Sequence, residues 1–214
     1  MKESVETLRY FDNIMKDCKK LFLKKNRDYG PSWLVLRWES LIDQIWIKTK
    51  RIRKLEQTSD KKLIPEGRDV EYIGIINYSI IGLIRLWYKD ELPNPDEIVN
   101  KGKIIEIDEE KLSRFYDNIV NEVRNLLIKK NHDYGEAWRD MKITSITDQI
   151  FVRLFRCKKI LENGKLEVSE GLEAQFSDII NYALFALIKL QIKEKKNETI
   201  TVFDTFKSKP KENR

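Results

Sequence analysis

The stretch FDNIMKDCKKLFLKKNRDYGPSW, residues 11–33, returns as YDNIVNEVRNLLIKKNHDYGEAW at residues 116–138. At an offset of 105, residues 12–54 are identical to residues 117–159 at 17 of 43 positions. Unrelated chains of this composition would share about three. This similarity indicates that part of the chain has been duplicated.

A second aligned region follows after a one-residue deletion. At an offset of 104, residues 66–86 match residues 170–190 at nine of 21 positions, including the run Ile-Ile-Asn-Tyr at 75–78 and 179–182. Self-similarity of this extent at a nearly fixed spacing indicates a repeated structural unit. We therefore interpret the chain as two diverged copies of one module, called copy A and copy B.

Each copy is predicted to contain three helices. Apolar residues in the first segment, such as Phe11, Ile14, Met15 and Cys18, follow the spacing of an amphipathic helix. The tract Asp-Tyr-Gly ends this helix, because glycine readily adopts the left-handed conformation that follows a helix. The predicted helices span 6–26, 36–57 and 66–88 in copy A, and 109–131, 141–163 and 170–194 in copy B.

The fold class that follows is all-α, a tandem duplication of a three-helix module forming a pseudo-two-fold six-helix bundle. Pro93 and Pro95 mark a linker between the copies. In the tail, Thr199–Phe206 is expected to be a short extended segment laid on the body. The predicted divisions are copy A at 1–90, the linker at 91–107, copy B at 108–195, and a basic, partly disordered tail at 196–214.

Composition favours a soluble, cytoplasmic protein with no membrane association. Hydrophobic residues make up 41% and charged residues 36% of the chain, which is typical of helix-rich globular proteins. The longest apolar run, Ile73–Trp87, contains Asn77 and Arg85, so we judge it too short and too polar to span a bilayer. The N-terminus lacks the apolar stretch of a signal peptide.

The residue inventory limits the chemistry. His132 is the only histidine, and Cys18 and Cys157 are the only cysteines, which excludes zinc sites built on these residue types. We expect both cysteines to be buried as small apolar residues. The net charge of +6 lies partly in the tail and does not by itself indicate a nucleic-acid-binding face. Any chemistry must therefore come from carboxylates, Lys, Arg, Tyr and Asn.

A first polar group surrounds the Asp-Tyr-Gly tract in both copies. In a functional interpretation, its lysines and aspartates face a cleft where lysine binds phosphate, and its aromatic residues stack on a base. In a structural interpretation, aspartate binds the turn backbone and tryptophan fills the core. The candidate ligand-binding residues are Lys25, Asp28 and Tyr29 in copy A, and Lys130, Asp133, Tyr134 and Trp138 in copy B.

A second group lies on the second helix of each copy, where Asp-Gln-Ile is followed by two basic residues. Asp43 and Arg51 lie two turns apart on one face, with Lys48 beside them. The pattern fits either a ladder of salt bridges or an anion-binding strip, and the spacing favours neither. The candidate anion-binding residues are Lys48, Arg51, Arg153 and Arg156.

Acidic residues open the third helix, and an asparagine lies in its apolar middle. The helix dipole alone favours acids in a first turn, but acids one turn apart can also hold Mg²⁺. We expect Asn77 and Asn181 to be buried and to bond to the second helix of their own copy. They serve either fold specificity or the binding site, and both are candidate ligand-binding residues. Copy B is the better predicted metal site, because Asp178 stands where copy A has Gly74. The candidate Mg²⁺ ligands, not all around one ion, are Asp148, Glu170, Glu173 and Asp178.

At these residues the chain resembles the nucleotide-modification-associated domain family of bacteria and phages. The resemblance rests on K-x-x-DYG-x-x-W, D-Q-I-x-x-K/R-x-x-R and E-G followed by I-I-N-Y, and covers both copies. It implies an association with nucleotide metabolism or modified bases. A looser similarity to MazG-type all-α nucleoside triphosphate pyrophosphatases implies Mg²⁺ held by a carboxylate-rich helix pair. The chain departs from that pattern, since it has no E-x-x-E on the second helix.

The main hypothesis is a nucleotide-binding protein associated with nucleotide metabolism or modification, with Mg²⁺-dependent hydrolysis of (deoxy)nucleoside triphosphates as the reaction to test. Lys130, Arg153 and Arg156 would take the phosphate charge, and Asn181 would orient the ligand. The alternatives are a non-catalytic helical binding or assembly module, and a weak nucleic-acid-binding protein that uses the lysine-rich helix ends and tail. No pattern in the sequence specifies an oligomeric state.

Overall fold

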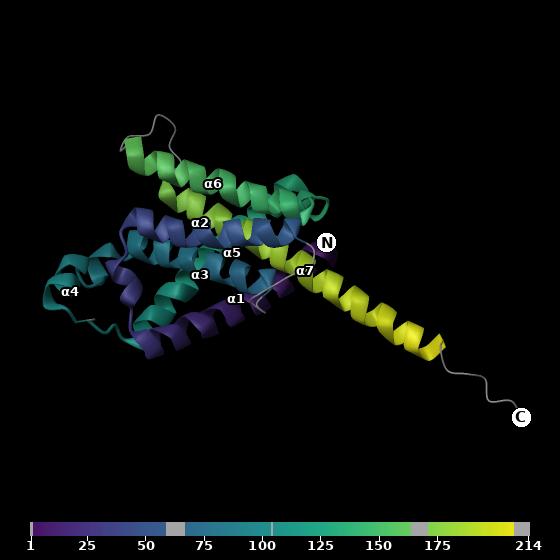
Figure 1. The fold of residues 1–214 in the computed structure, drawn as a ribbon, viewed down its shortest axis with the longest axis horizontal. Coiled ribbons are helices and arrows are strands. Elements are labelled where there is room, and N and C mark those ends of the chain that lie inside the picture. The colour runs from purple at the N-terminus through teal and green to yellow at the C-terminus, as the bar shows by residue number, and fades with distance from the viewer. Residues whose placement is uncertain (1, 59–66, 104, 164–170, 208–214) are drawn as a thin grey trace, which may run out of the picture.

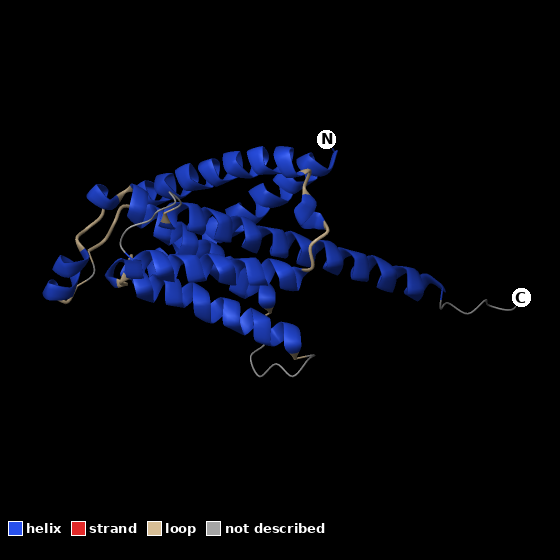
Figure 2. Cartoon of the chain, turned by 90° about the horizontal axis from the view of Figure 1, so that it is seen from above, coloured by secondary structure: helices blue, strands red, loops and turns tan. Residues whose placement is uncertain are grey.

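The computed structural model describes residues 2–58, 67–103, 105–163 and 171–207, and within these ranges every regular element is a helix (Figure 2). All six predicted helices are present, so the all-α prediction is confirmed. They are α1 (Lys2–Tyr29), α2 (Trp38–Gln57), α3 (Arg68–Trp87), α5 (Glu109–Tyr134), α6 (Ile143–Asn163) and α7 (Leu172–Lys207).

Equivalent helices of the two copies pack against each other. Helix α1 contacts α5, α2 contacts α6, and α3 contacts α7. In Figure 1, α2 and α6 run along one side of the body and α1 along the opposite side, with α3 and α7 between them. One apolar core runs through both copies. Pairing of each helix with its counterpart is the arrangement expected of two copies related by a two-fold axis.

The central helices α3 and α7 approach each other closely at Gly82. A Cβ atom at this position would lie 2.7 Å from the Phe176 ring, so a larger residue would push the helices apart. By length and hydropathy alone, α3 is able to cross a membrane, which corrects the judgement that its apolar run is too short. Of its most apolar window, 56% is buried inside the bundle. Core helices meet the same two criteria, so burial accounts for this composition.

Helices α1 and α5 end at the Asp-Tyr-Gly tract, as predicted. Gly30 and Gly135 have φ angles of 62° and 58°, the left-handed conformation that follows a helix. A short 3₁₀ turn comes next in each copy, at Ser32–Val35 and Ala137–Arg139. These turns carry the motif tryptophans into the core and lead directly into α2 and α6.

The linker between the copies and the C-terminal tail both differ from the predictions. The linker contains helix α4 (Pro95–Lys101), because Asn94 caps it by accepting a hydrogen bond from the Asp96 backbone N–H at 2.9 Å. Pro95 lies in the first helical turn, where its missing N–H costs nothing. The prediction of an extended segment at Thr199–Phe206 is wrong, because α7 continues to Lys207 and extends beyond the other helices (Figure 1). The last tail residues, 208–214, lie outside the described residues.

Candidate functional site

Motif residues of copy A line a pocket of about 420 Å³ formed by α1, α2, α3 and the turn after α1. Its size is within the range of small-molecule sites. Three of the four polar groups identified in the sequence contribute to it, although copy B was expected to hold the better site. The motif residues in the lining are Lys25, Asn26, Tyr29, Gly30, Trp33, Gln44, Lys48 and Asn77, and Gly74 and Tyr78 lie beside them.

Two hydrogen bonds fix the inner wall of the pocket. The Asn26 amide donates to the Phe22 carbonyl at 2.8 Å, and the Trp33 indole N–H donates to Asn26 Oδ1 at 2.9 Å. Trp33 is buried, and its ring also packs beside Phe22. The structural interpretation of the tryptophan is therefore correct in copy A, while one edge of the ring still faces the pocket.

Lys48 reaches the pocket by crossing Gly74 on α3. A Cβ atom at Gly74 would lie 2.7 Å from Lys48 Cε, so the glycine provides the space through which the lysine passes. Lys48 Nζ lies 3.2 Å from Oε2 of Glu71, a buried carboxylate that also forms an ion pair with Arg51. In copy A, Lys48 and Arg51 therefore form salt bridges, and their acidic partner comes from α3 rather than from Asp43.

Lys25 differs from Lys48 and Arg51, which pair with Glu71. Its side chain is exposed at the pocket, and no acidic group in the described part of the chain pairs with it. Asp28 is exposed as well, and the Tyr29 side chain is 69% exposed. The mouth of the pocket thus presents a solvated ammonium group and a free aromatic ring.

In copy B, Asp178 occupies the position of Gly74 and binds the counterparts of both pocket lysines. Its carboxylate forms an ion pair with Lys130, and its Oδ2 lies 3.2 Å from Nη2 of Arg153. Only 13% of the Asp178 side chain is exposed. Two of the three cations expected to bind phosphate in copy B therefore already bind an internal carboxylate.

Aromatic packing in copy B also differs. Phe185 replaces Ile81 and stacks on Trp138, with ring centroids 4.5 Å apart and planes 4° from parallel. Trp138 is buried beneath this contact, whereas Tyr134 is 73% exposed. Stacking of a base on Trp138 would have to displace Phe185, so Tyr134 is the predicted aromatic residue that stays accessible.

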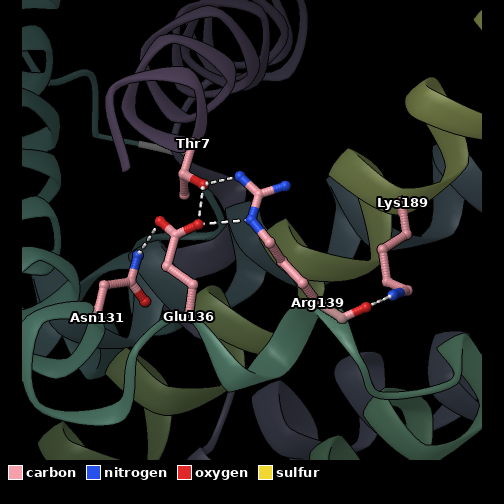
Figure 3. A network of polar contacts seen from close by, with 5 residues as sticks. All are labelled: Thr7, Asn131, Glu136, Arg139 and Lys189. Atoms are coloured by element: carbon pink, nitrogen blue, oxygen red, sulfur yellow. Dashed lines mark hydrogen bonds and ion pairs between the residues drawn. The ribbon is translucent and has the colours of Figure 1, made fainter. Parts of the chain in front are cut away.

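A polar network that the sequence did not reveal surrounds Glu136, the counterpart of Pro31 (Figure 3). Its carboxylate accepts hydrogen bonds from Thr7 Oγ1 and Asn131 Nδ2, both at 3.1 Å, and pairs with Arg139 Nε at 2.5 Å. Lys189 donates to the Arg139 carbonyl, and burial lowers the pKa of this lysine. Asn131 is thus turned toward Glu136 and does not bond to Trp138.

The two buried asparagines have different surroundings. Both are buried as expected, but the predicted bonds to the second helix are wrong. The Asn77 amide donates to the Cys18 carbonyl at 3.1 Å and accepts from the Tyr116 hydroxyl at 2.9 Å. Asn181 has no hydrogen-bond partner among the described residues. The counterpart of Tyr116 is Phe11, which has no hydroxyl, so Asn181 Oδ1 lacks the donor that Asn77 Oδ1 has.

The predicted magnesium ligands are dispersed in the part of the chain that the structure describes. Asp148 is 59% exposed and lies 3.9 Å from Arg53, Glu173 is exposed, and Asp178 is held by its two cations. No three acidic, His or Cys side chains among the described residues gather into a metal site. Glu170 lies outside these residues, so the magnesium site stays a prediction.

The remaining predicted residues make surface contacts. Asp133 pairs with the neighbouring His132 ring at 3.1 Å, and Arg156 is exposed on α6. Asp43 lies 2.9 Å from Lys158, the counterpart of the Arg53 that faces Asp148. The aspartates of the second helices therefore join the two copies.

Both cysteines are free and buried, as expected. Burial raises the pKa of the Cys18 and Cys157 thiols to about 12. Since the thiolate is the nucleophilic form, these residues are inert at neutral pH.

The sequence profile described as nucleotide modification associated domain 1 matches residues 25–86 and 130–190, more than half of the chain. The chain belongs to this family. The first match begins at Lys25 and the second at its counterpart Lys130, so each copy is one domain of the nucleotide modification associated family. No curated protein and no solved structure matches the chain.

Proposed function

We propose that this protein binds a nucleotide in the copy A pocket, with the phosphate between Lys25 and Lys48. The observation that carries the proposal is the unpaired Lys25 at the pocket. Its counterpart Lys130 has an acidic partner in Asp178. A cation that faces a pocket without an acidic partner favours an anionic ligand, because charge-assisted hydrogen bonds to phosphate are among the strongest that a side chain forms.

The rest of the pocket suits a nucleoside. Tyr29 and Tyr78 offer aromatic surface for a base, and the Gln44 amide is available for hydrogen bonds to base edges. The Asn77 amide is already committed to Cys18 and Tyr116, so we assign it to fixing the position of α3. The family's association with nucleotide modification supports the same class of ligand.

Magnesium-dependent hydrolysis has less support. None of the described residues that line the pocket is acidic, whereas a phosphate-bound metal ion needs carboxylate oxygens. Replacement of Asp148 by Asn separates the two ideas. Nucleotide binding in copy A should be unchanged in this variant, whereas a metal site that includes Asp148 should be lost together with any Mg²⁺-dependent turnover.

The test is a thermal-shift panel of nucleoside mono-, di- and triphosphates, each with and without Mg²⁺. A ligand that binds only the folded protein must raise its melting temperature. Lys25→Ala should then weaken binding of the selected nucleotide by about 10- to 100-fold, as expected for loss of a charged hydrogen bond. Lys130→Ala is the matched control and should leave the affinity unchanged.

Two outcomes would contradict the proposal. A panel without any shift would favour the binding or assembly module that needs no nucleotide. Equal losses in the two lysine variants would show that the cation at Lys25 has no special role. The nucleic-acid alternative predicts binding to single or double strands with a steep dependence on salt, which the same instrument can measure.

A further inference from the structure

We propose that copy B holds a latent anion site, which Asp178 occupies with its own carboxylate. Removal of this side chain would convert copy B into a second phosphate-binding site. The inference rests on the proposed function, because it takes copy A as the copy that binds ligand in the native protein.

The position of the carboxylate is the first argument. Asp178 bridges Lys130 and Arg153, which are the counterparts of the two lysines that line the copy A pocket. Carboxylate and phosphate oxygens accept hydrogen bonds from such cations in the same way. Asp178 therefore stands where a phosphate would lie in copy A, and there Gly74 contributes no side chain, so that the end of Lys48 lies beside it.

Unsatisfied polar atoms around this position are the second argument. Buried polar atoms normally have a partner, but in copy B several have none among the described residues. Gln175 and Asn181 are 1% and 4% exposed, and both amides belong to the helix that carries Asp178. The atoms are Arg153 Nε, Trp138 Nε1, Gln175 Oε1, and both Asn181 Oδ1 and Nδ2.

The counterparts of three of these residues lie at the copy A pocket. Trp33, Lys48 and Asn77, the equivalents of Trp138, Arg153 and Asn181, all line the pocket. Copy B therefore has polar residues at positions that line the pocket in copy A. Oxygens of a bound anion would accept hydrogen bonds from the three donors, Arg153 Nε, Trp138 Nε1 and Asn181 Nδ2, and a water bound with the anion would donate to the two amide oxygens.

The size of the ligand follows from Phe185. This ring covers Trp138, whereas copy A has the smaller Ile81 at the pocket. Loss of the Asp178 side chain would free the place of one carboxylate and leave the aromatic contact closed. The latent site should therefore accept phosphate or pyrophosphate, and a whole nucleotide only after Phe185→Ile as well.

The test is calorimetric titration with inorganic pyrophosphate and with each of the four deoxynucleoside triphosphates. Wild-type protein should bind one equivalent, and Asp178→Ala should bind two equivalents of pyrophosphate. Gly74→Asp should copy the internal ion pair into copy A and reduce binding there at least tenfold. The atoms that a new Cβ would meet belong to the flexible end of Lys48, so this variant should fold.

The double variant Gly74→Asp/Asp178→Ala completes the exchange and should bind one equivalent of pyrophosphate, now in copy B. If Asp178→Ala does not fold, Asp178→Ser tests the same point, since it removes the carboxylate and most of its volume. A single equivalent in wild type and in the folded Asp178 variant would overturn the inference and leave the proposed function intact. Absence of binding in wild type, with one equivalent in the Asp178 variant, would overturn the proposed function alone.

Discussion

Copies A and B carry basic residues at equivalent positions but pair them with acidic residues at different positions. Lys25, Lys48 and Arg51 of copy A correspond to Lys130, Arg153 and Arg156 of copy B, but the acidic residue of the third helix that pairs with members of each set differs. In copy A the acid is Glu71, which lies one turn before Gly74 and forms ion pairs with Arg51 and Lys48. In copy B the acid is Asp178, in the place of the glycine, and it closes the site. The carboxylate of copy B thus lies three residues further along the third helix than that of copy A. This shift distinguishes the open site of copy A from the filled site of copy B.

A second difference lies in how each copy satisfies its polar groups. In copy A, Asn26 bonds to Trp33 and Asn77 bonds to Tyr116. In copy B, the equivalent asparagine bonds to Glu136, and Asn181 has no partner among the described residues. Copy B has thus been rebuilt around an internal network, while copy A has kept a pocket.

The largest expected effect comes from the network of copy B. Glu136→Ala should cost about 3 kcal/mol of unfolding free energy, the lower end of the range for a broken buried ion pair, because Arg139 is partly exposed. The matched change in copy A, Pro31→Ala, should cost less than about 1 kcal/mol, since it acts mainly through the unfolded chain. Urea denaturation measures both. Equal costs would show that the network adds nothing to stability.

The next effect concerns the buried asparagines. Asn77→Leu should cost about 1–3 kcal/mol, because it leaves the Tyr116 hydroxyl without its acceptor. Asn181→Leu should be neutral or stabilising, since it removes an amide that has no described partner. Melting temperatures of the two variants make the comparison. A larger loss for Asn181→Leu would mean that copy B contains a partner, such as water, that holds this amide.

The smallest effect concerns a polar chain between the copies. The Tyr72 hydroxyl lies 2.8 Å from Thr147 Oγ1, which donates to Glu56 Oε1 at 2.9 Å. The equivalent residues on the other side, Phe176, Ile42 and Leu161, are all apolar. Burial raises the pKa of Glu56, and the hydrogen bond from Thr147 opposes this only in part.

The sign of the pH dependence follows from that raised pKa. The folded state favours the protonated form of Glu56. The stability that protonated Glu56 contributes is therefore complete below the ordinary pKa of glutamate, and it is lost as the pH rises through the pKa of Glu56 in the folded protein. Glu56→Gln should therefore raise the melting temperature at pH 7 by less than about 2 °C. The gain should vanish below about pH 4. A gain that does not change with pH would contradict the assignment.

Local signals explain why the helices could be predicted. Apolar spacing and the glycines after α1 and α5 depend only on neighbouring residues, and both are visible in the sequence. Helix α4 was not predicted, because proline is common both in linkers and in the first turn of a helix, and Pro95 was assigned to a linker.

The site could be predicted only in part, because its decisive contacts cross between elements and copies. The sequence identified Lys25, Lys48 and Asn77, which line the pocket. We expected each buried asparagine to bond within its own copy, whereas Asn77 bonds to Tyr116 of the other copy. The binding site of a copy is open only where no carboxylate reaches the basic residues of its first two helices. The spacing of residues along one helix does not give that distance between helices.

The central pairing of α3 with α7 also affects how the protein is made. Helix α3 leaves the ribosome roughly eighty residues before α7 begins, a delay on the order of ten seconds at ordinary rates of synthesis. During this time the most apolar helix of the chain, which is long enough to cross a bilayer, lacks its main packing partner. Its exposed surface would be a target for chaperones and for aggregation. The nascent chain should therefore be most vulnerable between the completion of α3 and the arrival of α7.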